Sequence, residues 1–139
     1  MNFFFDRNIS PYIARMLDAY DRQNTITHLD DDARFEFTTP DVIWINTLAK
    51  DDSKPILITA DGTIQKNPTE RIALIESSLS IVFVKRSFLK LHFHQQAVKF
   101  LQIWPDLINS TGRCKVPTVF EMTAGARKID RLMATSQLR

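Results

Sequence analysis

Three aspartates in the first half of the chain have the residue type and placement of a metal-binding group. Asp6 follows a run of three phenylalanines, Asp61 comes shortly after a second apolar run, and Asp41 follows a Thr-Pro pair typical of a helix start. Carboxylates that meet in one crevice raise one another's pKa values and destabilise the fold unless a cation neutralises them. Mg²⁺ prefers oxygen ligands of this kind and can activate water for attack on a phosphodiester.

Each aspartate also has an ordinary structural explanation. Asp6 could cap the helix that follows it, and Asp41 suits the first turn of a helix. Asp61 precedes a glycine, and this pair is typical of turns. These explanations treat the residues one at a time, whereas convergence of all three on one edge of a sheet favours the metal site. Asn8, two residues beyond Asp6, could orient a carboxylate or a metal-bound water.

The elements that must position these residues alternate between strands and helices. Apolar runs, typical of strands buried on both faces of a parallel sheet, predict strands at residues 3–5, 55–59 and 80–84. Residues 25–29 are expected to form a further short strand. A capping residue followed by proline predicts the helix starts Ser10-Pro11, Thr39-Pro40 and Asn67-Pro68. This alternation predicts right-handed crossovers and an α/β fold, a three-layer α/β/α sandwich with a mostly parallel central sheet. The carboxyl ends of its strands share the edge at which ligands bind.

The second half of the chain is less regular. A long helix is expected over residues 87–103, and Pro105 should break or restart it. Residues 116–122 are expected to form a last strand at the edge of the sheet. From about residue 124 the chain is basic, and we expect a helix or a frayed tail there, with an exposed surface suited to a dimer or a protein partner.

Length and composition indicate a single domain over residues 1–139. One cysteine, Cys114, excludes an internal disulfide and favours a reducing compartment. No apolar run approaches the ~20 residues of a membrane-spanning helix, and the first residues do not resemble a signal peptide. We therefore expect a cytoplasmic protein without a membrane partner. Acidic residues are in excess over residues 1–61 and basic residues beyond them.

Several segments together resemble PIN-like domains, related to the VapC-type toxins of bacterial toxin–antitoxin systems. The resemblance covers residues 2–84 in order, with weaker support from Trp104-Pro105. The segments that carry it are FFFDRNISP (3–11), TPDVIWI (39–45), ITADGTI (58–64) and NPTER (67–71).

The resemblance implies a PIN fold, a Mg²⁺- or Mn²⁺-dependent endoribonuclease acting on RNA, and a cognate antitoxin protein. Asp6, Asp41 and Asp61 would take the metal-binding acidic positions, with Asn8 and Thr59 in support. Many PIN domains carry a further acidic residue shortly after the position of Asp61, but Gly-Thr-Ile-Gln stands here. A catalytically degenerate PIN-like interaction module is therefore the alternative to an active nuclease.

Further expectations concern the basic residues, another function class and Glu70. Five basic residues near the predicted carboxyl edge are candidates for binding the RNA backbone: Arg7, Lys66, Arg71, Lys85 and Arg86. A phosphoacceptor domain with Asp61 as the phosphorylated residue is a third function class, and it leaves Asp41 unexplained. Glu70, three residues after Asn67, fits a capping box and is not an obvious replacement for the missing acid.

Overall fold

The computed structural model of the chain describes residues 1–60 and 67–138. In these ranges a six-stranded sheet has the order β2-β1-β3-β4-β5-β6. Neighbouring strands are parallel from β2 to β5, and β6 alone runs antiparallel to its neighbour. The strands are β1 (Asn2–Phe5), β2 (Thr25–His28), β3 (Ile56–Ala60), β4 (Ile81–Val84), β5 (Thr118–Met122) and β6 (Asp130–Ala134).

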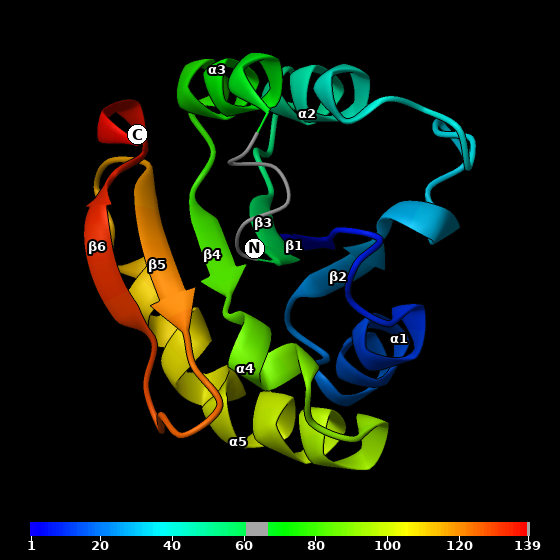
Figure 1. The fold of residues 1–139 in the computed structure, drawn as a ribbon, viewed down its shortest axis with the longest axis vertical. Helices are drawn as coiled ribbons and strands as arrows, with labels where there is room; N and C mark the ends of the chain where they lie inside the picture. Colours follow the sequence, from blue (N-terminus) through cyan, green and yellow to red (C-terminus); the bar gives the residue numbers. More distant parts are fainter. Residues whose placement is uncertain (61–66, 139) are drawn as a thin grey trace.

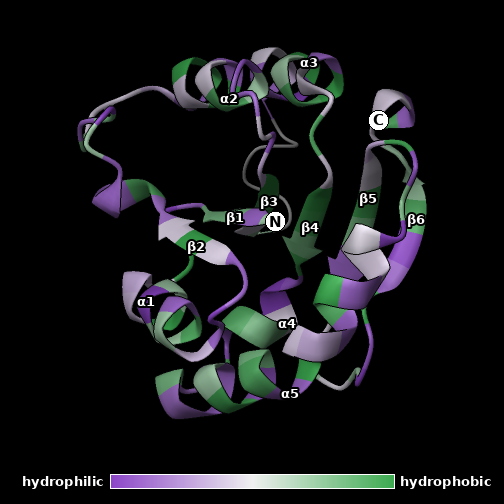
Figure 2. Ribbon diagram, turned by 180° about the vertical axis from the view of Figure 1, so that it is seen from behind, coloured by the Kyte–Doolittle hydropathy of each residue, from purple (hydrophilic) through white to green (hydrophobic). Residues whose placement is uncertain are grey.

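Helices cover both faces of this sheet (Figure 1). One face packs on α2 (Asp41–Ala49) and α3 (Pro68–Ser77), and the other on α1 (Pro11–Tyr20), α4 (Arg86–Leu89) and α5 (Phe93–Gly112). Figure 2 shows β4 as apolar throughout, whereas the helices alternate between apolar and polar residues. The prediction of a three-layer α/β/α sandwich with a mostly parallel sheet is thus confirmed.

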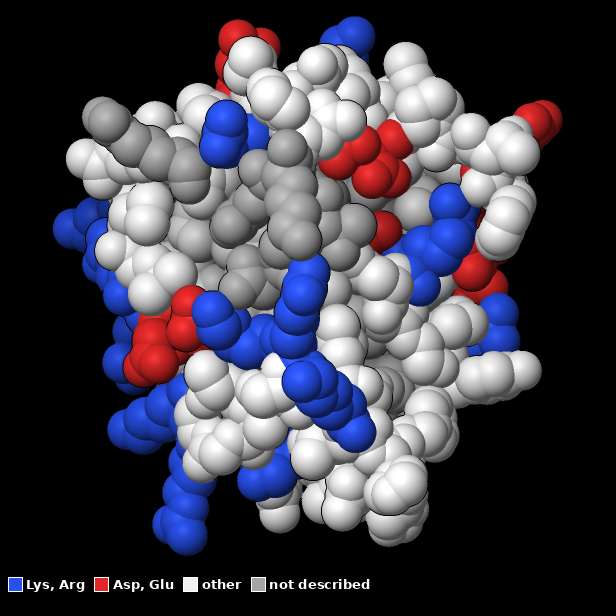
Figure 3. Space-filling view, in the orientation of Figure 1, with Lys and Arg blue, Asp and Glu red and all other residues white. Residues whose placement is uncertain are grey.

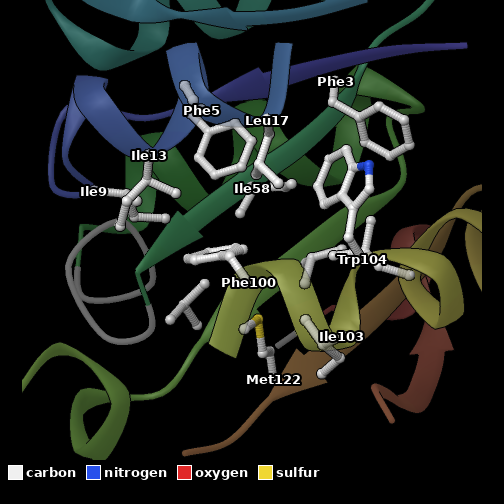
Figure 4. Close-up of a cluster of buried hydrophobic side chains, with 14 of the residues drawn as sticks. Phe3, Phe5, Ile9, Ile13, Leu17, Ile58, Phe100, Ile103, Trp104 and Met122 are labelled. Atoms are coloured by element: carbon white, nitrogen blue, oxygen red, sulfur yellow. The ribbon is translucent and has the colours of Figure 1, made fainter. Parts of the chain in front are cut away.

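Strand β1 supplies both hydrophobic cores because successive side chains of a strand point to opposite faces. Phe3 and Phe5 belong to the core under α1 and α5, and Phe4 to the core under α2 and α3. Trp104 of α5 lies against Phe3, with ring centroids 4.9 Å apart, and Phe100 lies 5.5 Å from Phe5 (Figure 4). Burial of these aromatic rings fixes the strand from which Asp6 leaves the sheet.

Two of the three predicted helix caps are present. The Ser10 side chain accepts a hydrogen bond from the backbone of Tyr12 at the start of α1. The Asn67 side chain accepts from the first turn of α3. The prediction for Thr39 was wrong, because Pro40 is the N-cap of α2 and makes no side-chain cap. The Thr39 hydroxyl instead accepts a 2.8 Å hydrogen bond from Glu36 N, within the preceding loop.

The expected break at Pro105 is also wrong. Helix α5 continues through Pro105 to Gly112, because the buried Trp104 holds this part of the helix against the sheet. The break lies instead between α4 and α5, where the side chains of His92 and Gln95 form a reciprocal capping box. No helix in the described ranges, α5 included, combines the length and apolarity needed to cross a membrane.

The C-terminal part of the chain differs most from expectation. Strand β5 lies inside the sheet, between β4 and β6, and is not an edge strand. The segment from about residue 124, expected as a basic helix or tail, contains β6 and a 3₁₀ turn, η2 (Thr135–Gln137). The backbone of β5 provides the partner that β6 needs. Thr135 anchors the end of β6, because its hydroxyl donates a 2.7 Å hydrogen bond to Leu79 O.

Candidate active site

The candidate site lies where the strand order of the sheet reverses. From β1 the chain crosses to β2 on one side and later to β3 on the other. In open α/β sheets this reversal is where a crevice for ligands forms, at the carboxyl ends of the strands, here β1 and β3. Asp6 is the first residue after β1, and its backbone N–H donates a 2.9 Å hydrogen bond to Ile58 O of β3. Thr59 and Ala60 end β3 on the other side of the same crevice.

The Asp6 carboxylate is buried, with 5% of the residue exposed, and it is held from two sides. The Thr59 hydroxyl donates a 2.7 Å hydrogen bond to Oδ2, and the backbone N–H of Arg7 donates to Oδ1. Burial raises the pKa of Asp6, and the charge of Asp41 adds to the rise. The bonds from Thr59 and Arg7, with the Arg7 charge, lower the pKa but do not outweigh burial.

Two more carboxylates reach the same crevice from helix N-termini. Asp41 is the first residue of α2, and the indole N–H of Trp44 donates a 2.9 Å hydrogen bond to its Oδ1. Glu70 lies in the first turn of α3, near enough to Asp41 for the two carboxyl groups to affect each other. Burial raises the pKa of Glu70, as do the charges of Asp41 and Asp6. Figure 3 shows acidic side chains gathered beneath α2 and α3.

The structure therefore brings together Asp6 and Asp41, two of the three predicted metal ligands. Asp61, the third, lies outside the described residues. Glu70 joins the group, although sequence reasoning assigned it to a capping box. One signal in the sequence could have identified it: Glu70 follows Asn67-Pro68 in a first helical turn, much as Asp41 follows Thr39-Pro40. Parallel crossovers place both of these helix starts at the carboxyl edge of the sheet.

Neighbouring polar residues fix the loop that follows Asp6. The Asn8 side-chain oxygen accepts a 3.2 Å hydrogen bond from Ala60 N, which ties this loop to the end of β3. On the other side, His28 Nε2 donates to Ile9 O at 2.7 Å, and its Nδ1 accepts from Asp30 N at 3.0 Å. Asn8 thus positions the backbone of the crevice, and its role in orienting a carboxylate or a metal-bound water stays a prediction.

Two of the predicted basic residues directly follow carboxylates of the site: Arg7 follows Asp6, and Arg71 follows Glu70. The Nε of Arg7 donates a 2.8 Å hydrogen bond to Asp30, and the charge of Arg7 acts on Asp6. Lys85 follows β4 and lies 3.6 Å from Glu121 of β5. Figure 3 shows basic side chains over the end of β4 and α4, below the acidic group. Lys66 lies outside the described residues.

The donor atoms of the site suit a hard cation, since Mg²⁺ and Mn²⁺ take carboxylate oxygens. Asp6, Asp41 and Glu70 act on one another through their charges, and a cation would relieve this repulsion. Within residues 1–60 and 67–138, however, no set of three or more His, Cys, Asp or Glu side chains is arranged to hold a metal ion. Asp6, Asp41 and Glu70 thus offer oxygen atoms of the kind that Mg²⁺ or Mn²⁺ binds, but the described residues alone do not form a complete metal site.

Comparison with known proteins identifies one family. The model of a family described as PIN-like domains matches residues 1–86, the segment that contains β1 to β4 and the three interacting carboxylates. Comparisons with curated proteins and with solved structures found no match.

Proposed function

Because the chain belongs to the family of PIN-like domains, we propose that it is a Mg²⁺- or Mn²⁺-dependent endoribonuclease and the toxin of a toxin–antitoxin pair. PIN-like domains are commonly nucleases. One observation carries the proposal for this chain: Asp6, Asp41 and Glu70 interact through their charges at the switch point of the sheet. Groups that only supported the fold would gain nothing from such mutual repulsion.

In this proposal Asp6, Asp41 and Glu70 hold the metal, with Asp61 completing the set. The ion would supply a Lewis acid that neutralises phosphate charge and lowers the pKa of water. The chain's own contribution is orientation. Thr59 and the Arg7 N–H each hold one Asp6 oxygen, and the indole of Trp44 holds one Asp41 oxygen. A carboxylate oxygen that accepts one hydrogen bond still has a lone pair for the ion.

The choice of RNA, the antitoxin and the cytoplasmic location rest on the resemblance to VapC-type toxins. Basic residues at the carboxyl edge, among them Arg7 and Arg86, would bind the phosphate backbone. A second copy of the chain is a further candidate partner. The catalytically degenerate interaction module is the outcome if the carboxylates bind no metal.

A cleavage assay tests the nuclease. The purified chain should cut a labelled single-stranded RNA with Mg²⁺ or Mn²⁺ and stop when EDTA is added. Asp6→Asn, Asp41→Asn and Asp61→Asn should each lose at least a hundredfold in rate while remaining folded by circular dichroism. Asp52→Asn, a change at an exposed aspartate, is the matched control and should cleave like the parent.

Two results would contradict the proposal. Metal-dependent cleavage that persists in the Asp6→Asn and Asp41→Asn proteins would mean that the site is misassigned. No heat of Mn²⁺ binding and no cleavage by the parent would favour the interaction module. The toxin role has its own test: expression in bacteria should arrest growth, and a small protein encoded beside the gene should restore growth and copurify with the chain.

A further inference from the structure

An aromatic ring is exposed beside the candidate active site. Phe37 has 77% of its surface in solvent, more than any other large hydrophobic residue in the described ranges. The guanidinium carbon of Arg7 lies 4.8 Å from the centroid of the Phe37 ring. A phenylalanine left in water contributes little to the stability of the fold, and its ring is accessible to a ligand.

The Arg7 guanidinium that stacks on this ring is fixed by two other groups. Its Nε donates a 2.8 Å hydrogen bond to Asp30, and one terminal nitrogen donates a 3.4 Å bond to Glu36 O. These contacts restrain the guanidinium plane before any ligand arrives. A planar group held in this way can stack on an aromatic ring and on a nucleobase alike.

The loop that carries Phe37 is held in one conformation. Thr39 N donates a 3.0 Å hydrogen bond to Glu36 O, which makes Glu36–Thr39 a tight turn with Phe37 at its tip. Glu36 N donates a 2.8 Å bond to the Thr39 hydroxyl and closes the turn a second time. At the base of the loop, Arg34 bridges Asp32 and Asp51. These hydrogen bonds and ion pairs therefore fix the position of the turn that carries the Phe37 ring.

Each member of the Arg7–Phe37 pair lies close in sequence to a carboxylate of the candidate site. Arg7 directly follows Asp6, and its charge acts on the Asp6 carboxyl group. Phe37 precedes Asp41 by only a few residues, with the tight turn and Pro40 between them. A nucleic acid whose phosphate lay at the carboxylates would therefore have a neighbouring base within reach of the ring.

We propose that Phe37 and Arg7 form a stacking site for an unpaired base of the substrate, next to the phosphate that is cut. The inference rests on the proposed nuclease function and adds a base-binding site to it. The base must be unpaired, because a base within a duplex cannot leave its stack without cost. Aromatic rings stack on any base, so the site selects for unpaired structure more than for sequence.

The surroundings of the ring favour a base over a protein partner. Glu36 and Thr38, its neighbours in the turn, are exposed polar residues, and one cation covers part of the ring. Protein-binding hot spots are instead clusters of apolar side chains around a central anchor. A single aromatic ring paired with an arginine is typical of single-strand recognition.

Kinetics on matched substrates test the inference. Phe37→Ala should raise KM for a single-stranded RNA by about tenfold to a hundredfold, with kcat less affected, whereas Phe37→Trp should restore tight binding. On RNA with one abasic position beside the cut, parent and Phe37→Ala proteins should have similar KM values. Phe93→Ala removes another half-exposed phenylalanine, at the start of α5, and should cleave like the parent. Mn²⁺ affinity should not change in any of these proteins.

Failure of the inference and failure of the nuclease proposal are distinguishable. If the parent cleaves RNA and Phe37→Ala has the same KM on intact RNA, the stacking site is wrong and the nuclease stands. If the parent does not cleave, the nuclease proposal fails, and the fluorescence of Phe37→Trp becomes the readout. Quenching by single-stranded oligoadenylate, with none by an abasic strand, would support stacking, and absence of quenching would overturn it. Loss of a copurifying protein in Phe37→Ala, with RNA binding intact, would also overturn it.

Discussion

The hydroxyl of Thr59 donates a 2.7 Å hydrogen bond to Asp6 Oδ2, although 53 residues separate the two in the chain. Thr59 is fully buried in β3, and Asp6 is nearly so. This bond crosses the point where the sheet reverses its strand order. It therefore links the two strands that form the crevice and fixes the orientation of the most buried carboxylate of the site.

Replacing this hydroxyl should weaken the site. Thr59→Val removes a hydrogen bond that lowers the pKa of Asp6, so that pKa should rise further. The pH of half-maximal cleavage should then move upward, because more alkaline solution is needed to ionise Asp6. Loss of the bond should also cost about 1–3 kcal/mol of unfolding free energy, measured by urea denaturation. Thr47→Val, whose hydroxyl bonds only to Ile43 O on α2, is the control and should leave the pH profile unchanged.

Asp6 should destabilise the metal-free protein at neutral pH. Burial raises its pKa above 3.8, so the folded state holds the proton more tightly than the unfolded chain does. The contribution of the protonated group is fully present below pH 3.8 and is lost as the pH rises through the raised pKa. In EDTA, Asp6→Asn should thus raise Tm by a few degrees at pH 7, and the gain should shrink on acidification. A variant that is less stable than the parent at pH 7 would contradict this account.

The two tryptophans offer a matched pair of substitutions. Each is buried and donates its indole N–H to an aspartate: Trp44 to Asp41 at 2.9 Å, and Trp104 to Asp21 at 3.0 Å. Trp→Phe should cost about 1–3 kcal/mol of stability at either position. Only Trp44→Phe should weaken Mn²⁺ binding in calorimetry, by roughly tenfold or more, because it releases a proposed ligand. An equal loss of Mn²⁺ affinity in both variants would indicate a general effect of lower stability.

Glu70 can be tested as the acid that sequence reasoning did not assign to the metal. Burial and the charges of Asp41 and Asp6 raise its pKa, so Glu70→Gln should relieve repulsion and stabilise the metal-free protein by roughly 0.5–2 kcal/mol. The same change should lower Mn²⁺ affinity about tenfold or more if Glu70 is a ligand. Glu76→Gln, at an exposed position of the same helix, should alter stability by less than about 0.5 kcal/mol and leave Mn²⁺ affinity unchanged. Unchanged Mn²⁺ affinity in Glu70→Gln would remove Glu70 from the site.

The parts of the fold that followed from the sequence are those governed by local patterns. Apolar runs and cap-then-proline pairs predicted four strands and the starts of α1 and α3, and parallel crossovers then placed Asp6 and Asp41 at one edge. Glu70 was missed because its spacing from Asn67 fits a capping box equally well. Its contact with Asp41 depends on how α2 and α3 pack against each other, which local sequence does not reveal.

In the second half of the chain, tertiary contacts determine the secondary structure. Proline lacks a backbone N–H, so Pro105 was expected to end the helix, yet the burial of Trp104 beside it offsets the missing hydrogen bond. The segment Asp130–Ala134 is largely exposed and has no clear alternation of apolar residues, and it forms a strand because β5 provides a partner along its edge. Neither influence can be read from the residues of the segment itself.

The packing of α5 against β1 has a consequence for how the protein matures on a ribosome. Phe3 and Phe5 are made well before Phe100 and Trp104, the residues that cover them. Until then the strand that positions Asp6 lacks one of its covering layers. A nascent chain therefore carries Asp6 and Asp41 before α5 is present to hold β1, so the proposed site can form only after α5 has been made.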